Sequence, residues 1–170
     1  MNFHLTIRTA RGADADILQS LYRQLIDDEN VKATARQIQI LEDDARTRLL
    51  VCEIDGRIRG TVLVCLCADA MYAGQPFAVV ENLVVDQECR RNGIGRALLR
   101  EVEQFCRSRD CSKIMLLSSA ARVDAHRFFE QFGFLGDRKR GFVKYRSQFA
   151  ETACDLLSLA GQKRMVDDSM

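Results

Sequence analysis

The segment from residue 79 to residue 99 constrains the fold most, because it places an apolar strand, a glycine-containing loop and an amphipathic helix in immediate succession. The loop carries Arg90, Arg91, Gly93 and Gly95. Glycine lets the backbone turn tightly and approach a ligand closely. The first turn of a helix offers unpaired N–H groups and the positive end of the helix dipole. The segment therefore predicts a pyrophosphate site at the start of the helix.

Two common phosphate-binding motifs do not fit this loop. The Walker motif needs a Gly-Lys pair followed by Ser or Thr, and no such pair follows here. The dinucleotide fingerprint needs a third small residue three positions after the second glycine, and that position holds Leu98. A Gly-x-Gly turn alone is also typical of an ordinary loop. The flanking arginines and the preceding strand with its acidic residue are what favour a phosphate site.

Composition excludes several other classes of protein. The chain has 170 residues, 47% hydrophobic and 29% charged, which suits one domain with its own core. The formal net charge is +1, so we expect no nucleic acid and no anionic membrane as partner. The first residues contain no basic stretch followed by a long apolar run, so we expect no signal peptide and no membrane span.

The cysteines indicate a reducing, cytoplasmic setting. There are seven of them, an odd number, and none are spaced Cys-x-x-Cys. Most lie within apolar runs, which favours buried free thiols over a zinc or disulfide framework. His4 and His126 show no metal-ligand spacing, so we predict no metal site.

Hydrophobic periodicity and turn signals predict the order of elements. Asp14 is the expected N-cap of the first helix, and Asp55-Gly56 is a two-residue hairpin signal. The expected elements are a strand over 5–9, helices over 14–27 and 32–42, a hairpin of 48–54 with 57–67, a loop over 68–76, a strand over 77–86, a helix over 93–109, a strand over 113–118, a helix over 123–132, a closing hairpin of 134 with 142–146, and a helix over 148–160.

Three stretches resemble the GNAT N-acetyltransferases, namely residues 81–86, the loop 90–96, and residues 122–134 with their Asp-Ala-His-Arg-Phe-Phe-Glu-Gln-Phe-Gly-Phe run. The resemblance implies an α/β (α+β) fold: a single GNAT domain over 1–146 with a mixed, mostly antiparallel central sheet flanked by helices. Residues 147–170 would add a C-terminal helix and tail. That helix either packs on its own domain or forms the contact of a homodimer, with helix exchange as one version.

Within the family, residues 124–128 most resemble aminoalkylphosphonate and other small-amine N-acetyltransferases. The position of Glu81 also matches the acidic residue of glucosamine-phosphate acetyltransferases. The resemblance therefore implies acetyl-CoA as cosubstrate and a small-molecule amine as acceptor.

The resemblance also implies which residues bind the coenzyme. The strand backbone at Leu83, Val84 and Val85 would run beside the pantetheine arm and the thioester. The other implied contacts are Arg90, Arg91, Asn92, Gly93, Ile94, Gly95, Arg96, Arg122 and Phe128.

Two positions depart from the family pattern. Arg122 stands where the family has a coenzyme-contacting Asn, and Phe129 stands where it has a Tyr proposed to protonate the leaving thiolate. Phenylalanine has no proton to give, so water, Tyr72, Tyr145 or the amine itself would have to supply it. A thiol of pKa about 8.5 is a fair leaving group, so the loss is tolerable.

Acetyl transfer needs a neutral amine, and a free alkylamine with a pKa of about 10.4 is mostly protonated at pH 7. Glu81 is the only acidic residue in 77–85, and we expect it to be buried, with a raised pKa, and to act as a base through a water. The alternative is a structural Glu81 paired with an arginine across the sheet. The thioester oxygen would accept a hydrogen bond from a strand N–H near Leu83 to Val85.

Several other polar residues have both a structural and a functional interpretation. His126 fits a packed or surface histidine better than a catalytic one, and Cys89 is expected to be inert. Residues 27–29 (Asp-Asp-Glu) are either a solvated helix end or an acidic rim for a cationic acceptor. The basic run 138–140 is expected to be a solvated hairpin tip, with contact to an anionic substrate as the alternative.

Two other functions remain open at this point. The acceptor could be a protein N-terminus or a lysine instead of a small molecule. The chain could also be a coenzyme A-binding module with little catalysis, which Phe129 favours.

Overall fold

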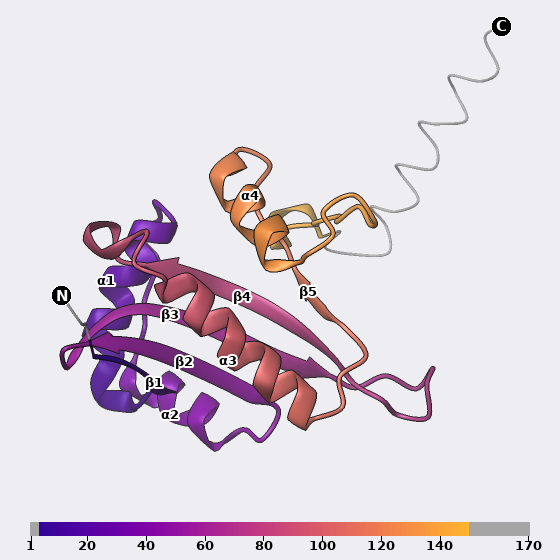
Figure 1. Ribbon diagram of the computed structural model, residues 1–170, viewed down its shortest axis with the longest axis horizontal. Helices are drawn as coiled ribbons and strands as arrows, with labels where there is room; N and C mark the ends of the chain where they lie inside the picture. Colours follow the sequence, from indigo (N-terminus) through magenta and orange to yellow (C-terminus); the bar gives the residue numbers. More distant parts are fainter. Residues whose placement is uncertain (1–3, 150–170) are drawn as a thin grey trace, which may run out of the picture. The chain divides into compact units, whose positions relative to one another are not determined.

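The computed structural model describes residues 4–149, in which five strands form one sheet in the order β1-β2-β3-β4-β5 (Figure 1). The first three pairings are antiparallel and the β4–β5 pairing is parallel. The elements are β1 (Leu5–Thr9), η1 (Gly12–Asp14), α1 (Ala15–Leu25), α2 (Ala35–Asp43), β2 (Thr47–Ile54), β3 (Arg57–Cys67), β4 (Phe77–Val85), η2 (Gln87–Cys89), α3 (Ile94–Ser108), β5 (Ile114–Leu116), α4 (Val123–Phe132) and η3 (Arg146–Gln148). The predicted mixed, mostly antiparallel sheet is thus confirmed.

The predicted hairpin of β2 with β3 forms around Asp55 and Gly56. Both residues have left-handed backbones, with φ of 49° and 77°. Two consecutive left-handed residues define the type I′ turn, whose twist matches that of the strands it joins. The hairpin is therefore specified locally by two residues.

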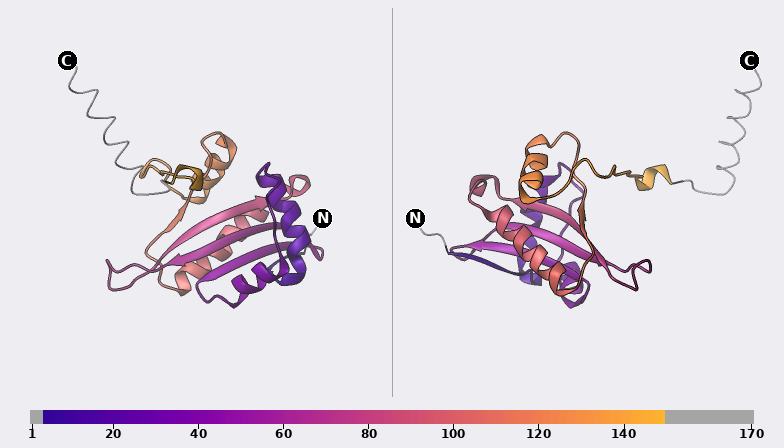
Figure 2. Two further views of the ribbon diagram at one scale, coloured as in Figure 1. Left: turned by 180° about the vertical axis from the view of Figure 1, so that it is seen from behind. Right: turned by 45° about the vertical axis from the view of Figure 1, so that its right-hand side comes forward.

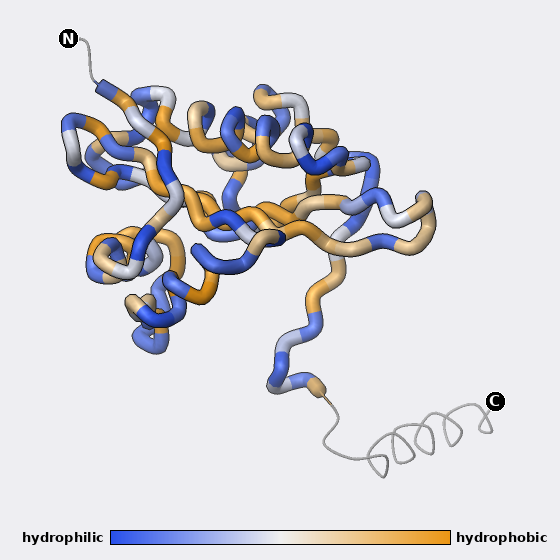
Figure 3. Tube along the Cα trace, turned by 90° about the horizontal axis from the view of Figure 1, so that it is seen from below, coloured by the Kyte–Doolittle hydropathy of each residue, from blue (hydrophilic) through white to orange (hydrophobic). Residues whose placement is uncertain are grey.

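Helices cover both faces of the sheet. Figure 2 shows α3 on one face and α1 with α2 on the other. Beneath α3 the buried cluster comprises Leu50, Cys52, Val62, Val64, Ala78, Val80, Ile94, Leu98, Leu99, Val102 and Cys106. The opposite cluster comprises Ala10, Leu18, Leu21, Ile38, Leu49, Val51, Ile58 and Val84. In Figure 3 the strands between the helices are mostly orange, as expected for strands buried on both faces.

The start of α3 packs closely on β3 at Gly60. A Cβ at Gly60 would lie 2.7 Å from Cγ2 of Ile94 and 3.2 Å from the carbonyl oxygen of Val84. Only a residue without a side chain lets the helix approach this closely. Gly60 therefore fixes how near the first turn of α3 lies to the central strands.

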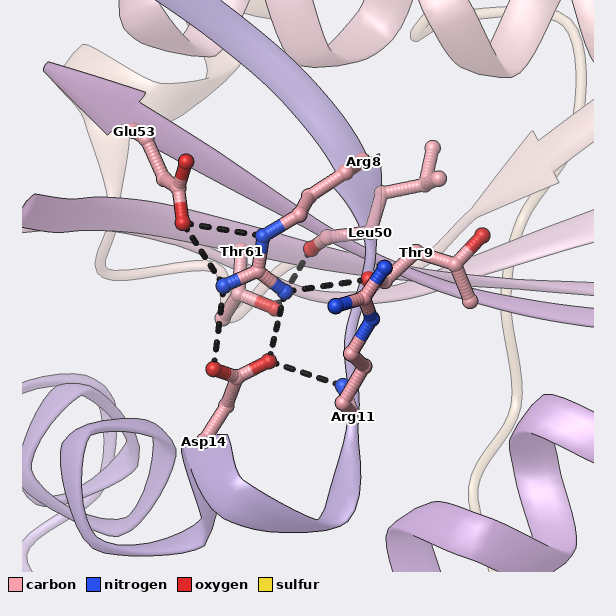
Figure 4. Close-up of polar contacts among 7 residues, drawn as sticks. All are labelled: Arg8, Thr9, Arg11, Asp14, Leu50, Glu53 and Thr61. Atoms are coloured by element: carbon pink, nitrogen blue, oxygen red, sulfur yellow. Dashed lines mark hydrogen bonds and ion pairs between the residues drawn. The ribbon is translucent and has the colours of Figure 1, made fainter. Parts of the chain in front are cut away.

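An ion-pair network joins β1 to the start of α1 (Figure 4). The guanidinium of Arg8 donates to Asp14 Oδ2 at 2.7 Å and Oδ1 at 3.0 Å, and its Nη2 lies 2.6 Å from Glu53 Oε1. The hydrogen bonds from Arg8, aided by the N–H of Arg11, hold the pKa of Asp14 below its usual value. Asp14 stands at the expected N-cap of α1, but the predicted capping is wrong: its carboxylate bonds to Arg8 and to the N–H of Arg11, and makes no cap hydrogen bond to α1.

The predicted closing hairpin of 134 with 142–146 is also wrong, because residues 133–145 contain no strand. Its first arm consisted of Phe134 alone, and a two-stranded pairing of that size is not stable by itself. Phe134 instead packs edge-on against Phe129, with ring centroids 5.9 Å apart. The basic run 138–140 thus lies in irregular chain and is no hairpin tip.

The chain divides into two compact units, Met1–Phe134 and Leu135–Met170. The predicted helix over 148–160 and Cys154 lie outside the described residues, apart from the first two positions of that helix. The boundary between 146 and 147 stays a prediction. Among the helices described, none has the length and apolar character that crossing a membrane requires.

Candidate functional site

The sheet opens between β4 and β5. The two strands pair only from Ala78 to Val80 on β4 and from Ile114 to Leu116 on β5. Beyond Val80 the strands diverge, and Figure 1 shows β5 running away from the sheet towards α4. The β4 backbone from Glu81 to Val85 therefore has no partner strand on this side within residues 4–149. An unpaired strand edge offers N–H and C=O groups to a ligand.

A β-bulge lies at the start of this free edge. Asn82 has a left-handed backbone with φ of 54°, and Asn82 and Leu83 together lie opposite the single residue Val62 of β3. An extra residue changes which side chains face each side of the sheet. Val80 belongs to the cluster under α3, whereas Val84 belongs to the cluster under α1 and α2. The predicted coenzyme-binding backbone of residues 83–85 thus follows directly after the bulge.

The structure places Glu81 beside this opening, but the predicted burial of its side chain is wrong, because the residue is exposed. The early end of the β4–β5 pairing leaves the strand edge beside Glu81 open, and no other element within residues 4–149 covers its side chain on the face of the sheet. Glu81 follows Val80, which faces α3, so its side chain lies on the opposite face of the sheet. No ion pair of Glu81 occurs among the described residues, so the alternative pairing with an arginine across the sheet is not observed there.

An ion pair that the sequence did not reveal shapes the turn after β4. Arg59 Nη1 lies 2.6 Å from Asp86 Oδ2, and Asp86 Oδ1 accepts a hydrogen bond from the N–H of Glu88 at 3.2 Å. Burial alone would raise the pKa of Asp86, but these hydrogen bonds outweigh it and leave the pKa below its usual value. The only available signal was the β2–β3 hairpin register, which places Arg59 near the end of the neighbouring strand.

The loop after this turn has a backbone that leaves N–H groups unpaired at the start of a helix. Arg91 and Gly93 both have left-handed backbones, with φ of 66° and 79°, and Gly93 is the N-cap of α3. The N–H of Ala97 bonds to the carbonyl of Gly93 at 2.9 Å, so the N–H groups of Ile94, Gly95 and Arg96 precede the first bond of the helix. These groups and the helix dipole favour a phosphate group here.

The arginines of the loop surround these N–H groups. Arg90, Arg91 and Arg96 are all exposed. Arg90 Nε donates to the carbonyl of Val85 at 3.4 Å, and the guanidinium of Arg96 lies 5.9 Å from the ring centroid of Phe132. Asn92 is exposed as well, whereas Ile94 is buried and anchors the loop in the core.

Helix α4 brings Phe128 against the same loop. A Cβ at Gly95 would lie 3.1 Å from Cζ of Phe128, so the second glycine of the motif leaves room for this ring. Arg122 is the exposed N-cap of α4. The structure thus brings together the predicted coenzyme residues of the loop and Phe128, and the sequence did not reveal that Gly95 and Phe128 touch.

Phe129 lies in an aromatic cluster, with its ring centroid 5.4 Å from that of Phe128. Of the alternative proton donors, Tyr72 is exposed on the loop before β4. It lies at the opposite end of that strand from the loop 90–96, which we call the phosphate loop. His126 is half-buried and its Nε2 lies 2.9 Å from the carbonyl oxygen of Ser119. That contact gives His126 a structural partner.

The acidic segment 27–29 follows the end of α1. There Gln24 Oε1 accepts a hydrogen bond from the N–H of Gln87 at 3.0 Å, which ties α1 to the turn after β4. All three acidic residues are exposed. Asp28 Oδ1 accepts hydrogen bonds from the backbone and side chain of Asn30, at 2.8 and 2.9 Å. The segment thus starts next to the chain that leads into the phosphate loop.

The six cysteines in the described part of the chain are free thiols, Cys89 among them. Within residues 4–149 no three His, Cys, Asp or Glu side chains gather as metal ligands.

Comparison with models of known protein families assigns the chain to one of them. The model of the acetyltransferase (GNAT) family matches residues 15–134. The matched range contains β4, the phosphate loop and α4. The chain therefore belongs to the acetyltransferase (GNAT) family.

Individual relatives differ in what they acetylate. A glucosamine 6-phosphate N-acetyltransferase from Trypanosoma brucei brucei is 30% identical over 88 residues, which cover 52% of this chain and 58% of the relative. The chain thus spans little more than half the length of that relative. An aminoglycoside N(6′)-acetyltransferase type 1 from Stenotrophomonas maltophilia is 30% identical over 131 residues, which cover 76% of this chain and 85% of the relative.

A solved structure of an aminoglycoside N-acetyltransferase, AAC(6′)-Iy in complex with CoA, has the same fold. It superposes with a TM-score of 0.73 at 16% identity and covers 86% of this chain and 97% of its own. At this identity the likeness concerns the fold alone.

Proposed function

We propose that the chain transfers the acetyl group of acetyl-CoA to the primary amine of a small cationic molecule. The amine attacks the thioester directly, the C–S bond breaks, and coenzyme A leaves as a thiolate that takes up a proton. Family membership supports the coenzyme, and the residues around the opening support the individual steps.

One observation carries the proposal: the free edge of β4 leads, through one turn, into the unpaired N–H groups at the start of α3. The loop would hold the pyrophosphate, with Arg90, Arg91 and Arg96 adding positive charge. The N–H and C=O groups of residues 83–85 would bond to the pantetheine arm. An N–H of the same edge would stabilise the negative charge that develops on the thioester oxygen.

Glu81 would act on the acceptor side. Its carboxylate is exposed at the start of the opening, where it can accept the proton of the attacking amine through a water. Because the side chain lies on the face opposite α3, it is separated from the phosphate loop. Loss of Glu81 should therefore affect catalysis more than coenzyme binding.

The exposed acidic residues Asp27, Asp28 and Glu29 favour a cationic acceptor over an anionic one. Opposite charges raise the local concentration of a substrate at a site. The aminoglycoside relative acts on a polycationic amine sugar by its name, and the glucosamine 6-phosphate relative on a sugar that also carries a phosphate. Acidic residues near the acceptor would disfavour that phosphate.

A second candidate is a coenzyme A-binding module with little catalysis. Phe129 favours it, because this residue sits in an aromatic cluster and offers no hydroxyl to the leaving thiolate. The two candidates predict the same coenzyme affinity and different turnover.

The deciding experiment measures free thiol released from acetyl-CoA with three acceptors: an aminoglycoside, glucosamine 6-phosphate, and a peptide with a free N-terminus and a lysine. We expect turnover to be fastest with the aminoglycoside. Asp27→Asn should raise KM for the aminoglycoside more than for glucosamine 6-phosphate, with Asp69→Asn, a half-buried aspartate on the loop before β4, as a control. Coenzyme binding by calorimetry without turnover on any acceptor would support the binding module and reject the enzyme.

A further inference from the structure

Two cysteine thiols meet at the end of α3, far from the phosphate loop. The helix ends in a Schellman motif: the N–H of Cys111 bonds to the carbonyl of Cys106 at 2.9 Å, and the N–H of Asp110 bonds to the carbonyl of Arg107 at 3.1 Å. Asp110 supplies the left-handed residue, with φ of 53°. In this motif the side chains at the positions of Cys106 and Cys111 are usually apolar and touch each other. Here both residues are cysteines, and Cys111 packs against the buried cluster that contains Cys106.

The same two residues border a cavity that opens to solvent. They line a cavity of about 250 Å³ together with Glu103, Arg107, Lys113 and Ile114. Cys111 is half-buried, whereas Cys106 lies deeper, at 4% exposure. Arg107 and Lys113 would attract an anionic reagent, and Glu103 is the opposing charge in the wall. The cavity lies about 18 Å along α3 from the phosphate loop, as twelve residues of helix imply.

We propose that Cys106 and Cys111 form a redox site that exchanges with an anionic low-molecular-weight disulfide of the glutathione type and closes reversibly to an internal disulfide. The more accessible Cys111 thiolate attacks one sulfur of glutathione disulfide, and the first glutathione leaves. The Cys106 thiolate then attacks the Cys111 sulfur, and the second glutathione leaves. Two protein thiols are oxidised, one disulfide is reduced to two glutathione thiols, and the two cysteine protons pass to these.

The fold favours this ring closure at equilibrium. A disulfide needs its two residues close together with their Cβ atoms facing, and the hydrogen bond from the N–H of Cys111 to the carbonyl of Cys106 already holds the two backbones together. The native chain therefore does not have to lose conformational freedom to bring them together. Burial raises the pKa of Cys106 to about 12 and raises that of Cys111. Few of the thiols are therefore ionised at neutral pH, and because the thiolate is the attacking form, exchange is slow. The test therefore measures the equilibrium and not the rate.

The bridge would tie the last turn of α3 to the segment that leads into β5, which begins at Ile114 (Figure 1). This site uses none of the residues assigned to acetyl transfer, so it does not depend on the proposed function.

The test equilibrates the full chain in glutathione buffers without oxygen, blocks free thiols by alkylation, and digests with trypsin. Trypsin cleaves after Arg107 and Arg109, so the peptides Glu101–Arg107 and Asp110–Lys113 separate unless a disulfide joins them. We expect the joined peptides, lighter by two hydrogen atoms than the sum of the free ones. The disulfide should form in the native chain in one glutathione buffer and in the urea-unfolded chain in another. The buffer for the native chain should be at least about tenfold more reducing.

Variants complete the experiment. Cys106→Ala and Cys111→Ala should abolish the joined peptides, and Cys89→Ala, a half-buried cysteine elsewhere, should leave them unchanged. The proposal would be overturned if the native and the unfolded chain were half oxidised at the same ratio of reduced to oxidised glutathione. So would a reaction that stops at a mixed disulfide of Cys111 with glutathione.

Discussion

Gly95 offers the sharpest test of the phosphate site, because its replacement acts through a contact that the structure resolves. A Cβ at this position would lie 3.1 Å from Cζ of Phe128, and ordinary contacts between such atoms are 3.4 Å or longer. Valine adds two further methyl groups to this contact. Overpacking of this kind costs roughly 1–3 kcal/mol.

The strain in Gly95→Val can relax in two ways. If the ring of Phe128 moves into the phosphate loop, the cost appears as a loss of acetyl-CoA affinity of roughly 5- to 150-fold. If the ring stays, the folded state carries the cost, and the melting temperature falls by about 2–4 °C per kcal/mol for a chain of this size. Calorimetry with acetyl-CoA and thermal unfolding of the same samples measure both terms.

A second substitution separates crowding of the ring from a direct block of the ligand. Phe128→Leu shortens the side chain that Gly95 meets. In the double variant, affinity and melting temperature should recover if Phe128 is the obstacle. Affinity alone should stay low if the valine itself excludes the phosphates. Arg100→Val, an exposed change on the same helix, is the matched control. Unchanged coenzyme affinity in Gly95→Val would refute the assigned role of this loop, whatever the melting temperature.

Four further changes test other parts of the molecule. Glu81→Gln should lower turnover roughly 10- to 10⁴-fold, with coenzyme affinity unchanged, and full activity at pH 7 would make Glu81 structural. Phe129→Tyr should leave turnover equal or slightly lower, because a hydroxyl among aromatic rings lacks a partner; a tenfold gain would contradict this. Asp14→Asn should cost about 1–3 kcal/mol in unfolding free energy at pH 7 through its bonds to Arg8. The pKa of Asp14 is lowered in the folded chain, so this difference, present above about pH 4, should shrink as pH falls further. Gly60→Ala should cost about 1–3 kcal/mol in denaturant unfolding, since its Cβ would meet Ile94 at 2.7 Å, whereas an unchanged midpoint would mean that α3 can shift.

Local signals predicted most of the fold. The Asp55-Gly56 turn, the amphipathic stripe of α3 and the tight turn at Gly93 depend on neighbours in sequence, and each came out as expected. Contacts between distant segments were harder. Asp14 was assigned a cap on its position alone, but Arg8 lies near it in space and competes for its carboxylate. The closing hairpin failed for the same reason, because Phe134 packs with the rings of α4.

The error at Glu81 shows why the site itself could be only half predicted. The apolar run of β4 correctly indicated a strand within the sheet, and burial was then inferred along its whole length. Whether a side chain of a strand is covered at a given residue depends on which helix or loop packs over that face of the sheet. β5 pairs with β4 over three residues, and the bulge at Asn82 turns the free part of β4 to new faces. Neither the length of a neighbour's pairing nor a bulge is encoded in the strand's own hydrophobic pattern. The short pairing with β5 also leaves the edge of β4 free, where we propose that the coenzyme binds. A sequence can therefore propose the residues of such a site, but whether its acidic group is exposed depends on which segments the fold packs over that strand.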